Sequence, residues 1–165
     1  MVPLLPGMAG PTNEDISIEM RLILHWQYQT ICRGGKSLIE KLKEITPDPR
    51  KYVEFYSLRQ HGVLEGKPVT ELIYIHTKLM IVDDLIAICG SANINDRSML
   101  GDRDSEICLI TRGNPNLTKV IDSQETPVNE AVHNLRVNLF KEHFGFHDSS
   151  DCEDPLNEKT VHLIR

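Results

Sequence analysis

Short apolar runs separated by polar pairs dominate the middle of the chain. Residues 72–75 and 79–82 are rich in β-branched and bulky apolar side chains, which predicts strands before and after the polar stretch at 76–78. The two aspartates at 83–84 are typical of a turn, and the apolar run at 85–89 predicts a returning strand. The pattern therefore predicts an antiparallel hairpin at the centre of the chain.

Helical spacing of apolar residues precedes this hairpin. A first helix begins at about Glu14, is capped by Thr12 or Asn13, and ends at Gly34. A second begins at Ser37, whose spacing to the glutamate three residues on is that of a capping box. The prolines that follow bring this second helix to an end.

Further elements are expected on both sides of the hairpin. Residues 52–58 predict a strand that leads into a polar loop, and residues 107–110 predict another buried strand. Asn95 is a cap for a short helical turn, and a last helix over 126–145 starts with Pro127 at its first position. Strands interspersed with helices indicate an α/β or α+β fold.

The C-terminal stretch differs in composition from the rest. Residues 147–165 are acidic, polar and poor in aromatic side chains, which predicts a mobile tail. We therefore expect one compact domain over residues 1–146, followed by this tail.

The polar stretch between the two central strands carries the candidate chemistry. Residues two apart on a strand share a face, so His76 and Lys78 are predicted to point the same way. Gly90 then lets the chain turn, so that Ser91 and Asn93 come to the rim of the neighbouring strand. A histidine beside a fixed positive charge, backed by hydroxyl and amide donors, is suited to phosphoryl chemistry.

Each of these residues taken alone has a simpler interpretation. A single histidine in a strand is more often a satisfied structural group than a catalyst, and a lone lysine or a Gly-Ser-Ala-Asn turn is commonplace. The combined spacing His-x-Lys-x4-Asp-x6-Gly-Ser-x-Asn, from His76 to Asn93, is far more specific. It favours the catalytic interpretation.

This spacing resembles the signature of the phospholipase D superfamily. The chain resembles eukaryotic, animal-type enzymes that cleave phosphatidylcholine. Residues 71–84 and 90–101 resemble their second catalytic motif, and further resemblance lies in residues 2–7, 25–28, 32–34, 57–59 and His61. The resemblance covers most of the chain before its acidic end. It implies an α/β fold with helices over both faces of a mixed β-sheet, present here as an incomplete half with one motif.

The resemblance also implies a two-step mechanism. One histidine attacks phosphorus to form a phosphohistidine, and water or an alcohol then releases phosphatidate or a phosphatidyl alcohol. Two motifs meet at a pseudo-two-fold axis, and His76, in the second motif, takes the role of general acid for the leaving choline. Lys78 and Asn93 hold the non-bridging phosphate oxygens, with Ser91 as a further donor to the charge that develops there.

A catalytic histidine also needs a partner that sets its tautomer and orientation. Asp83 belongs to the motif, but it lies seven residues from His76 with opposite strand parity. In the family the partner is a carboxylate after the turn, and Glu106 matches that position. We therefore assign the orientation of His76 to Glu106, and a structural, ion-paired role to Asp83.

Composition narrows the class of substrate. The 165 residues carry a formal net charge of −6 without a Lys/Arg cluster, which weakens the interpretation as a nuclease, so no nucleic-acid partner is expected. No polybasic stretch for anionic lipid is present, and no apolar run approaches the roughly 20 residues of a membrane-spanning helix. The four cysteines, at 32, 89, 108 and 152, lack metal-like spacing, so free thiols and no metal site are expected.

The number of motifs limits what the chain does by itself. It carries one His-x-Lys, whereas the implied chemistry needs two histidines. Three explanations are open: a fragment of a longer two-motif enzyme, a dimer that supplies one histidine per subunit as a phosphodiesterase or nuclease, or an inactive half-domain with a binding or regulatory role. We favour the first, because the similarity is to the second motif and not to compact single-motif enzymes.

The resemblance finally implies a setting for the reaction. The substrate is a phospholipid, the partner is a first motif from a missing N-terminal half or a second subunit, and contact with the membrane is peripheral. The catalytic step needs no cofactor, and phosphoinositide activation of the parent enzyme is compatible with the family. The opening residues lack the features of a signal peptide. The location that the resemblance implies is cytoplasmic, peripheral on intracellular or plasma membranes.

Overall fold

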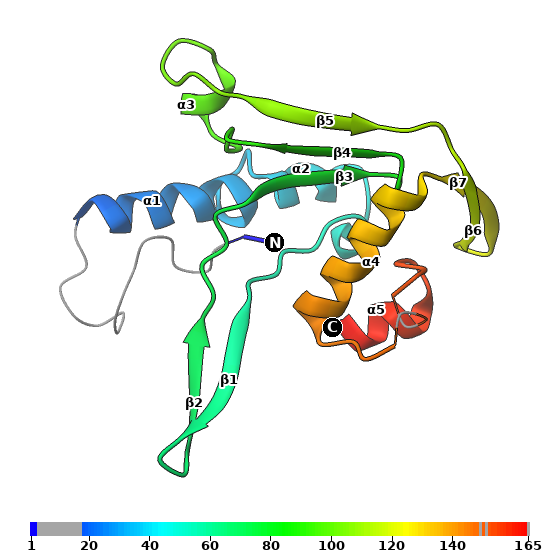
Figure 1. Ribbon diagram of the computed structural model, residues 1–165. Helices are drawn as coiled ribbons and strands as arrows, with labels where there is room; N and C mark the ends of the chain where they lie inside the picture. The colour runs from blue at the N-terminus through cyan, green and yellow to red at the C-terminus, as the bar shows by residue number, and fades with distance from the viewer. Residues whose placement is uncertain (3–17, 149, 151, 165) are drawn as a thin grey trace. The chain divides into compact units, whose positions relative to one another are not determined.

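The computed structural model describes residues 1–2, 18–148, 150 and 152–164. They form two compact units, one ending at His76 and one beginning at Thr77. Both units mix helices with strands, which confirms the predicted α/β class, and the sheets of the described residues are small and antiparallel (Figure 1). No helix in these ranges is long and apolar enough to cross a bilayer.

Two helical segments open the described part of the first unit. α1 (Ile18–Tyr28) continues into a π-helical turn, η1 (Gln29–Arg33). The chain leaves this turn at Gly34, where a Cβ would lie 2.7 Å from the carbonyl oxygen of Gln29, so the predicted helix end requires a glycine. The caps predicted at residues 12–13 lie outside the described residues.

The second helix starts as the sequence predicts. α2 (Leu38–Lys43) has Ser37 buried at its N-cap, and the Ser37 hydroxyl accepts a hydrogen bond from the backbone N–H of Glu40 at 3.4 Å. This contact satisfies one of the donors that every helix leaves open at its start. A 3₁₀ turn, η2 (Pro49–Lys51), follows after a cap at Asp48.

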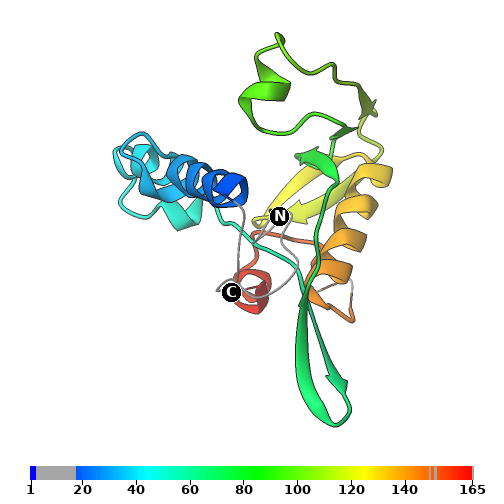
Figure 2. The same ribbon diagram turned by 90° about the vertical axis from the view of Figure 1, so that its left-hand side faces the viewer.

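A β-ribbon occupies the stretch predicted as a polar loop. It consists of β1 (Arg59–Leu64) and β2 (Lys67–Leu72), which pair antiparallel. The turn at Glu65-Gly66 has φ angles of 51° and 77°, the I′ geometry that suits the twist of two strands. Figure 2 shows the two strands running side by side. The residues of both strands are exposed, so no alternation of apolar and polar positions marks this ribbon in the sequence.

The strand predicted over 52–58 is wrong, because this segment is not a strand and makes only isolated hydrogen bonds with the residues that the structure describes. The backbone N–H of Val2 donates to Tyr56 O at 2.8 Å, and the Ser57 hydroxyl donates to Val2 O at 2.7 Å. The strand predicted over 72–75 is also wrong beyond its first residue, since β2 ends at Leu72 and the next strand begins at Lys78. Apolar, β-branched composition alone therefore overstated the strand content here.

The second unit opens with the predicted central hairpin. β3 (Lys78–Val82) pairs antiparallel with β4 (Ile86–Gly90), and β4 pairs antiparallel with β5 (Cys108–Arg112). The turn between β3 and β4 has φ angles of 51° and 52° at Asp83 and Asp84, and Leu85 N donates to Val82 O at 3.0 Å. The predicted hairpin and the strand predicted after Glu106 are thus confirmed.

The last long helix begins later than predicted. Pro127 lies inside β7 (Gln124–Val128), which forms a two-stranded hairpin with β6 (Leu117–Ile121), and it is not the first residue of a helix. α4 (Glu130–Phe144) starts after Asn129, whose side-chain oxygen accepts from Val132 N at 3.3 Å. The helix begins at the asparagine cap and not at the proline, because the Asn129 side chain satisfies an open N–H of the first turn. The helix ends at Gly145 (φ 69°), as predicted.

α4 is anchored to the central hairpin through buried polar contacts. Asn129 N donates to Asp84 O at 2.9 Å, so the helix cap meets the β3–β4 turn directly. The carboxylate of Asp84 accepts hydrogen bonds from His133 and Arg136, one and two turns along α4. The apolar residues buried around this contact are Ala87, Val128, Val132, Val137 and Cys152.

The segment after α4 also contributes to this buried region. Arg136 donates from Nη1 to Cys152 O and from Nη2 to Glu153 O, both at 2.6 Å. A further helix, α5 (Glu158–Ile164), follows. The domain boundary at residue 146 stays a prediction, and residues 152–153 beyond it are bonded to α4.

Candidate active site

The register of the β3-β4-β5 sheet places several motif residues at one end of it. Lys78, the first residue of β3, pairs with Gly90, the last residue of β4, and Gly90 pairs with Cys108, the first residue of β5. Ser91 therefore follows directly after the position opposite Lys78. Lys78 is half-buried, whereas Ser91 and Glu106 are exposed.

Gly90 is required by close packing between two strands. A Cβ there would lie 2.6 Å from Ile107 O and 2.7 Å from the Cβ of Cys108, distances that real side chains do not tolerate. The sequence predicted that the chain turns at Gly90. In the structure Gly90 is instead the last residue of β4. Its missing side chain lets the end of β4 approach the start of β5, which brings Ser91 beside the segment that carries Glu106.

Ser91 and Glu106 are joined by a short hydrogen bond. The Ser91 hydroxyl donates to Oε2 of Glu106 at 2.5 Å and accepts from the backbone N–H of Ile107 at 3.1 Å. Ser91 N donates to Ile107 O at 3.0 Å, which extends the pairing of β4 and β5 by one step. The hydroxyl also lies 3.4 Å from Ile107 O, but its single proton is better placed on the charged carboxylate.

Glu106 is held as a carboxylate. Hydrogen bonding to serine hydroxyls, first to Ser91 and then to Ser98, lowers the pKa of Glu106. Burial and the charge of Asp104 oppose this shift, and the positive charge of Lys78 adds the smallest lowering effect. The carboxylate is therefore charged at neutral pH, and it can accept a proton or a hydrogen bond from a neighbouring imidazole.

Asn93 lies in the loop between β4 and β5, which folds around a single helical turn, α3 (Asp96–Met99). The predicted cap of this turn is confirmed, because the side-chain oxygen of Asn95 accepts from Ser98 N at 3.1 Å. The backbone N–H of Asn93 donates to the Ser98 hydroxyl at 3.1 Å. The loop therefore folds back so that Ser98 contacts the backbone of Asn93.

An exposed ion pair closes the same loop. Nε and Nη2 of Arg97 donate to Asp104 at 3.0 Å and 2.9 Å, a two-pronged contact. The hydrogen bond between them raises the pKa of Arg97 and lowers the pKa of Asp104. Both groups are therefore charged, and they join the start of the loop to the segment just before Glu106.

His76 is the last residue of the first unit. It is exposed and lies outside the strands, and its ring stacks with the ring of Tyr74 at a centroid distance of 6.0 Å. The expectation that His76 shares a strand with Lys78 is therefore wrong, since β3 begins at Lys78. Within the second unit, the structure brings together Lys78, Ser91 and Glu106.

The ion-paired aspartate of the hairpin turn is Asp84 and not Asp83. Asp83 is exposed, and among the described residues no ion pair involves it, whereas Asp84 is buried and bonded to His133 and Arg136. Both partners lie about fifty positions further along, so no local pattern could identify them. Ser98, whose hydroxyl accepts from the backbone N–H of Asn93, was also missed, although its place three residues after the Asn95 cap is visible in the sequence.

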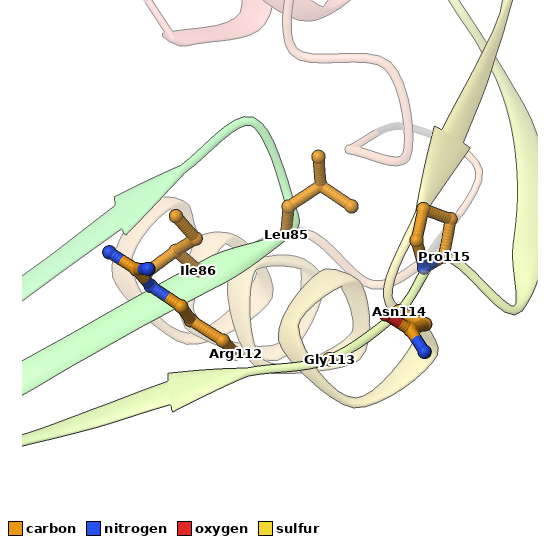
Figure 3. Close-up of a pocket in the computed structure, with 6 residues that line it drawn as sticks. All are labelled: Leu85, Ile86, Arg112, Gly113, Asn114 and Pro115. Carbon is orange, nitrogen blue, oxygen red and sulfur yellow. The ribbon is translucent and has the colours of Figure 1, made fainter.

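Two hollows flank the sheet. One, of about 460 Å³, adjoins the Ser91 end and is lined by Cys89, Gly90, Ser91, Ile107, Cys108 and Leu109. The other lies at the hairpin-turn end (Figure 3) and is lined by Leu85, Ile86, Arg112, Gly113, Asn114 and Pro115. In Figure 3 the Arg112 side chain lies along Ile86 and points away from Asn114, so the polar groups that line this hollow do not converge on one point. The hollow beside Ser91 is the better candidate for a substrate.

The described residues contain no group of three or more His, Cys, Asp or Glu side chains that could hold a metal ion. The polar groups gathered at the sheet end are one cation, hydroxyls and a carboxylate. Lys78 is suited to hold an anion, and Glu106, which accepts from the Ser91 hydroxyl, is suited to orient a histidine.

Comparison with known proteins agrees with this chemistry. The family model described as phospholipase D matches residues 2–165. The chain is 44% identical to a phospholipase D of Phytophthora infestans, 42% identical to phospholipase D1 of Mus musculus and 39% identical to phospholipase D zeta 2 of Arabidopsis thaliana. The alignments cover 100%, 96% and 97% of this chain but 9%, 15% and 16% of the relatives. The chain therefore spans less than a sixth of the length of these proteins.

Proposed function

Because the chain belongs to the phospholipase D family, we propose that it supplies one half of the active site of a phospholipase D-type phosphodiesterase. The substrate is phosphatidylcholine, which is converted to phosphatidate and choline, or to a phosphatidyl alcohol when an alcohol replaces water. The other half, with a second histidine, comes from a longer polypeptide or a second subunit.

The observation that carries this proposal is the pairing at the end of the β3-β4-β5 sheet. The register sets Lys78 opposite Gly90, and Ser91 next to it is bonded to Glu106. Lys78 at this strand end can contact a non-bridging oxygen of a phosphodiester, and the charged carboxylate can accept from a histidine. To donate to the phosphate as well, the Ser91 hydroxyl has to turn its one proton away from Glu106. Asn93, in the loop that follows, is the further phosphate-binding residue of the motif.

The proposed reaction has two steps. The histidine of the other motif forms a bond to phosphorus as the bond from phosphorus to the choline oxygen breaks, and His76 gives that oxygen its proton. In the second step His76, now neutral, takes a proton from water or an alcohol, whose oxygen displaces the first histidine from phosphorus. Glu106 orients the His76 ring and stabilises it when it is protonated.

The setting follows from the same proposal. The positive charge of Lys78 takes the place that a metal ion has in many phosphoryl-transfer enzymes, so no cofactor enters the catalytic step. Access to a phospholipid requires peripheral contact with a membrane on the cytoplasmic side, and regulation by phosphoinositides would act through parts of the polypeptide beyond this chain.

The test is transphosphatidylation by the complete gene product, with phosphatidylcholine vesicles and a primary alcohol. We expect phosphatidyl alcohol from the wild type, none from His76→Asn, and wild-type amounts from His147→Asn, which alters an exposed histidine outside the motif. We also expect a second in-frame His-x-Lys-x4-Asp upstream in the same transcript.

Other outcomes would replace the proposal. Cleavage of single-stranded DNA without lipid turnover would favour a homodimeric phosphodiesterase. A folded monomer that is inactive on both substrates would favour a binding or regulatory role. A complete transcript without a second motif would overturn the two-motif account.

A further inference from the structure

Tyr74 lies beside His76 in the segment that joins β2 to β3. The two rings are stacked, with 6.0 Å between their centroids and 20° between their planes. We propose that Tyr74 is a positioning residue, whose ring sets the plane of the His76 imidazole. This inference rests on the proposed function for its catalytic meaning, whereas the stacking itself can be tested without any activity.

The geometry of the pair is that of an offset aromatic stack. Such stacks have centroid separations of about 4.5–7 Å, and the separation between Tyr74 and His76 lies within that range. Both residues belong to the first unit, and both are exposed, whereas Ile75 between them is half-buried. This alternation places the two rings on one side of the chain and the isoleucine on the other.

The backbone beside Tyr74 is anchored. Ile73 N donates to Leu58 O at 3.1 Å, which extends the pairing of the β1–β2 ribbon one step beyond its last printed pair, Arg59 and Leu72. Tyr74 follows this hydrogen bond directly. His76 lies two residues further on, in a stretch that belongs to no strand. The tyrosine ring therefore starts from a fixed point next to a histidine that the ladder does not hold.

Stacking supplies a restraint that a hydrogen bond does not. A hydrogen bond to one ring nitrogen directs that nitrogen, but it leaves the imidazole free to rotate about the bond, and the χ2 torsion of histidine is broad. A flat partner against the ring face removes this rotation. In the proposed reaction Glu106 would fix the direction of the imidazole and Tyr74 its plane, so that the other nitrogen faces the leaving oxygen.

Two substitutions separate the ring of Tyr74 from its hydroxyl. Tyr74→Phe keeps the aromatic face and removes the hydroxyl, whereas Tyr74→Leu removes both and keeps an apolar side chain. Tyr74 is 52% exposed, so neither change opens a cavity in a core. A stacking role predicts that phenylalanine behaves as tyrosine does and that leucine does not.

The first experiment follows the His76 ring by NMR in the 165-residue chain. Histidine is labelled with ¹³C at Cε1, and the His76 signal is identified by its loss in His76→Asn. The ring current of an aromatic neighbour shifts such a signal, so Tyr74→Leu should move it and Tyr74→Phe should leave it near the wild-type position. Tyr52→Leu, which alters a tyrosine of the same unit that is 72% exposed, is the matched control and should not move it.

Three outcomes would overturn the inference. An unmoved His76 signal in Tyr74→Leu, or an equal movement in Tyr52→Leu, would show that the Tyr74 ring is not stacked on the histidine. An equal movement in Tyr74→Phe would assign the contact to the hydroxyl. If Tyr74→Leu does not fold, cross-relaxation between the ring protons of Tyr74 and His76 in the wild type decides, since its presence supports the stack and its absence contradicts it.

The second experiment measures transphosphatidylation by the complete gene product with the same variants. Tyr74→Leu should lower kcat about 2- to 10-fold, the range that one aromatic pair accounts for, with a nearly unchanged KM. Tyr74→Phe should keep the wild-type rate. A raised KM with an unaltered kcat in Tyr74→Leu would assign Tyr74 to substrate binding and overturn the positioning role. A wild type without lipid turnover contradicts the proposed function, whereas the NMR signal still decides whether Tyr74 holds the His76 ring.

Discussion

Arg136 and Asp84 form a buried two-pronged ion pair that joins α4 to the turn of the central hairpin. Nε of Arg136 lies 2.8 Å from Oδ1 of Asp84, and Nη2 lies 2.8 Å from Oδ2. His133 adds a third contact, with Nδ1 at 2.8 Å from Oδ2. The turn belongs to the hairpin whose other end carries Lys78 and Gly90, so this pair supports the strands on which the candidate site is built.

Replacement of Arg136 should be strongly destabilising. Arg136→Met leaves the buried Asp84 carboxylate with His133 alone and removes the donors to Cys152 O and Glu153 O, so we expect a loss of about 3–5 kcal/mol in the free energy of unfolding. Urea titration followed by circular dichroism measures it. Lys43→Met is the control, because it breaks an exposed pair with Glu40 and should cost about 0.3–0.5 kcal/mol. Equal losses of unfolding free energy in the two variants would show that the buried pair contributes no more to stability than the exposed pair does.

The same pair should make stability depend on pH in the acid range. Burial raises the pKa of Asp84, but hydrogen bonds and charge from Arg136 and His133 outweigh it, and the pKa lies below its ordinary value. A carboxyl whose pKa is lower in the folded state contributes stability that is complete above its unfolded pKa and is lost as pH falls through the folded pKa. Unfolding free energy should therefore fall with decreasing pH below about 4. The fall should be shallower in Asp84→Asn, and an equally steep fall there would exclude Asp84 as its source.

Gly90 should tolerate no side chain. In Gly90→Ala the new Cβ meets the backbone oxygen of Ile107 at 2.6 Å, and backbone cannot move aside as a flexible side chain can, so β4 and β5 must separate. We expect a loss of about 1–3 kcal/mol in unfolding free energy, as for other overpacked sites, together with weaker contact between Ser91 and Glu106. Thermal unfolding measures the loss of stability, and a ¹³C NMR titration of the Glu106 carboxylate measures the weaker contact with Ser91. Gly35→Ala, where a Cβ meets nothing within 4 Å, should do neither.

Local signals in the sequence predicted those elements whose determinants are themselves local. The apolar runs around Asp83-Asp84 predicted the hairpin, and the caps at Ser37 and Asn95 predicted where α2 and α3 begin, because a cap contacts the backbone two or three residues away. The exposed β1–β2 ribbon has no buried face, so periodicity gave no sign of it.

Local sequence patterns could not predict the long-range contacts. The partners of Asp84 lie on α4, and the choice between Asp83 and Asp84 as the buried residue depends on which of the two faces that helix. For the candidate site, the spacing of the motif identified Lys78 and Ser91, and the family resemblance identified Glu106; the structure brings these three residues together. Neither signal identified Ser98, whose hydroxyl accepts from the backbone N–H of Asn93, because that contact depends on how the intervening loop folds.

The final prediction concerns Lys78, which should affect the site through charge and through substrate contact separately. Lys78→Met removes a cation that makes a minor contribution to the lowered pKa of Glu106, so a ¹³C NMR titration of the Glu106 carboxylate in the 165-residue chain should show a small move to higher pH. In the complete gene product, the same change removes a donor to the developing phosphate charge, and we expect kcat to fall about 10²- to 10³-fold. Lys67→Met, in the exposed ribbon, is the matched control and should change neither measurement. A shifted titration with normal turnover would limit Lys78 to an electrostatic role on Glu106, and normal behaviour in both would remove it from the site.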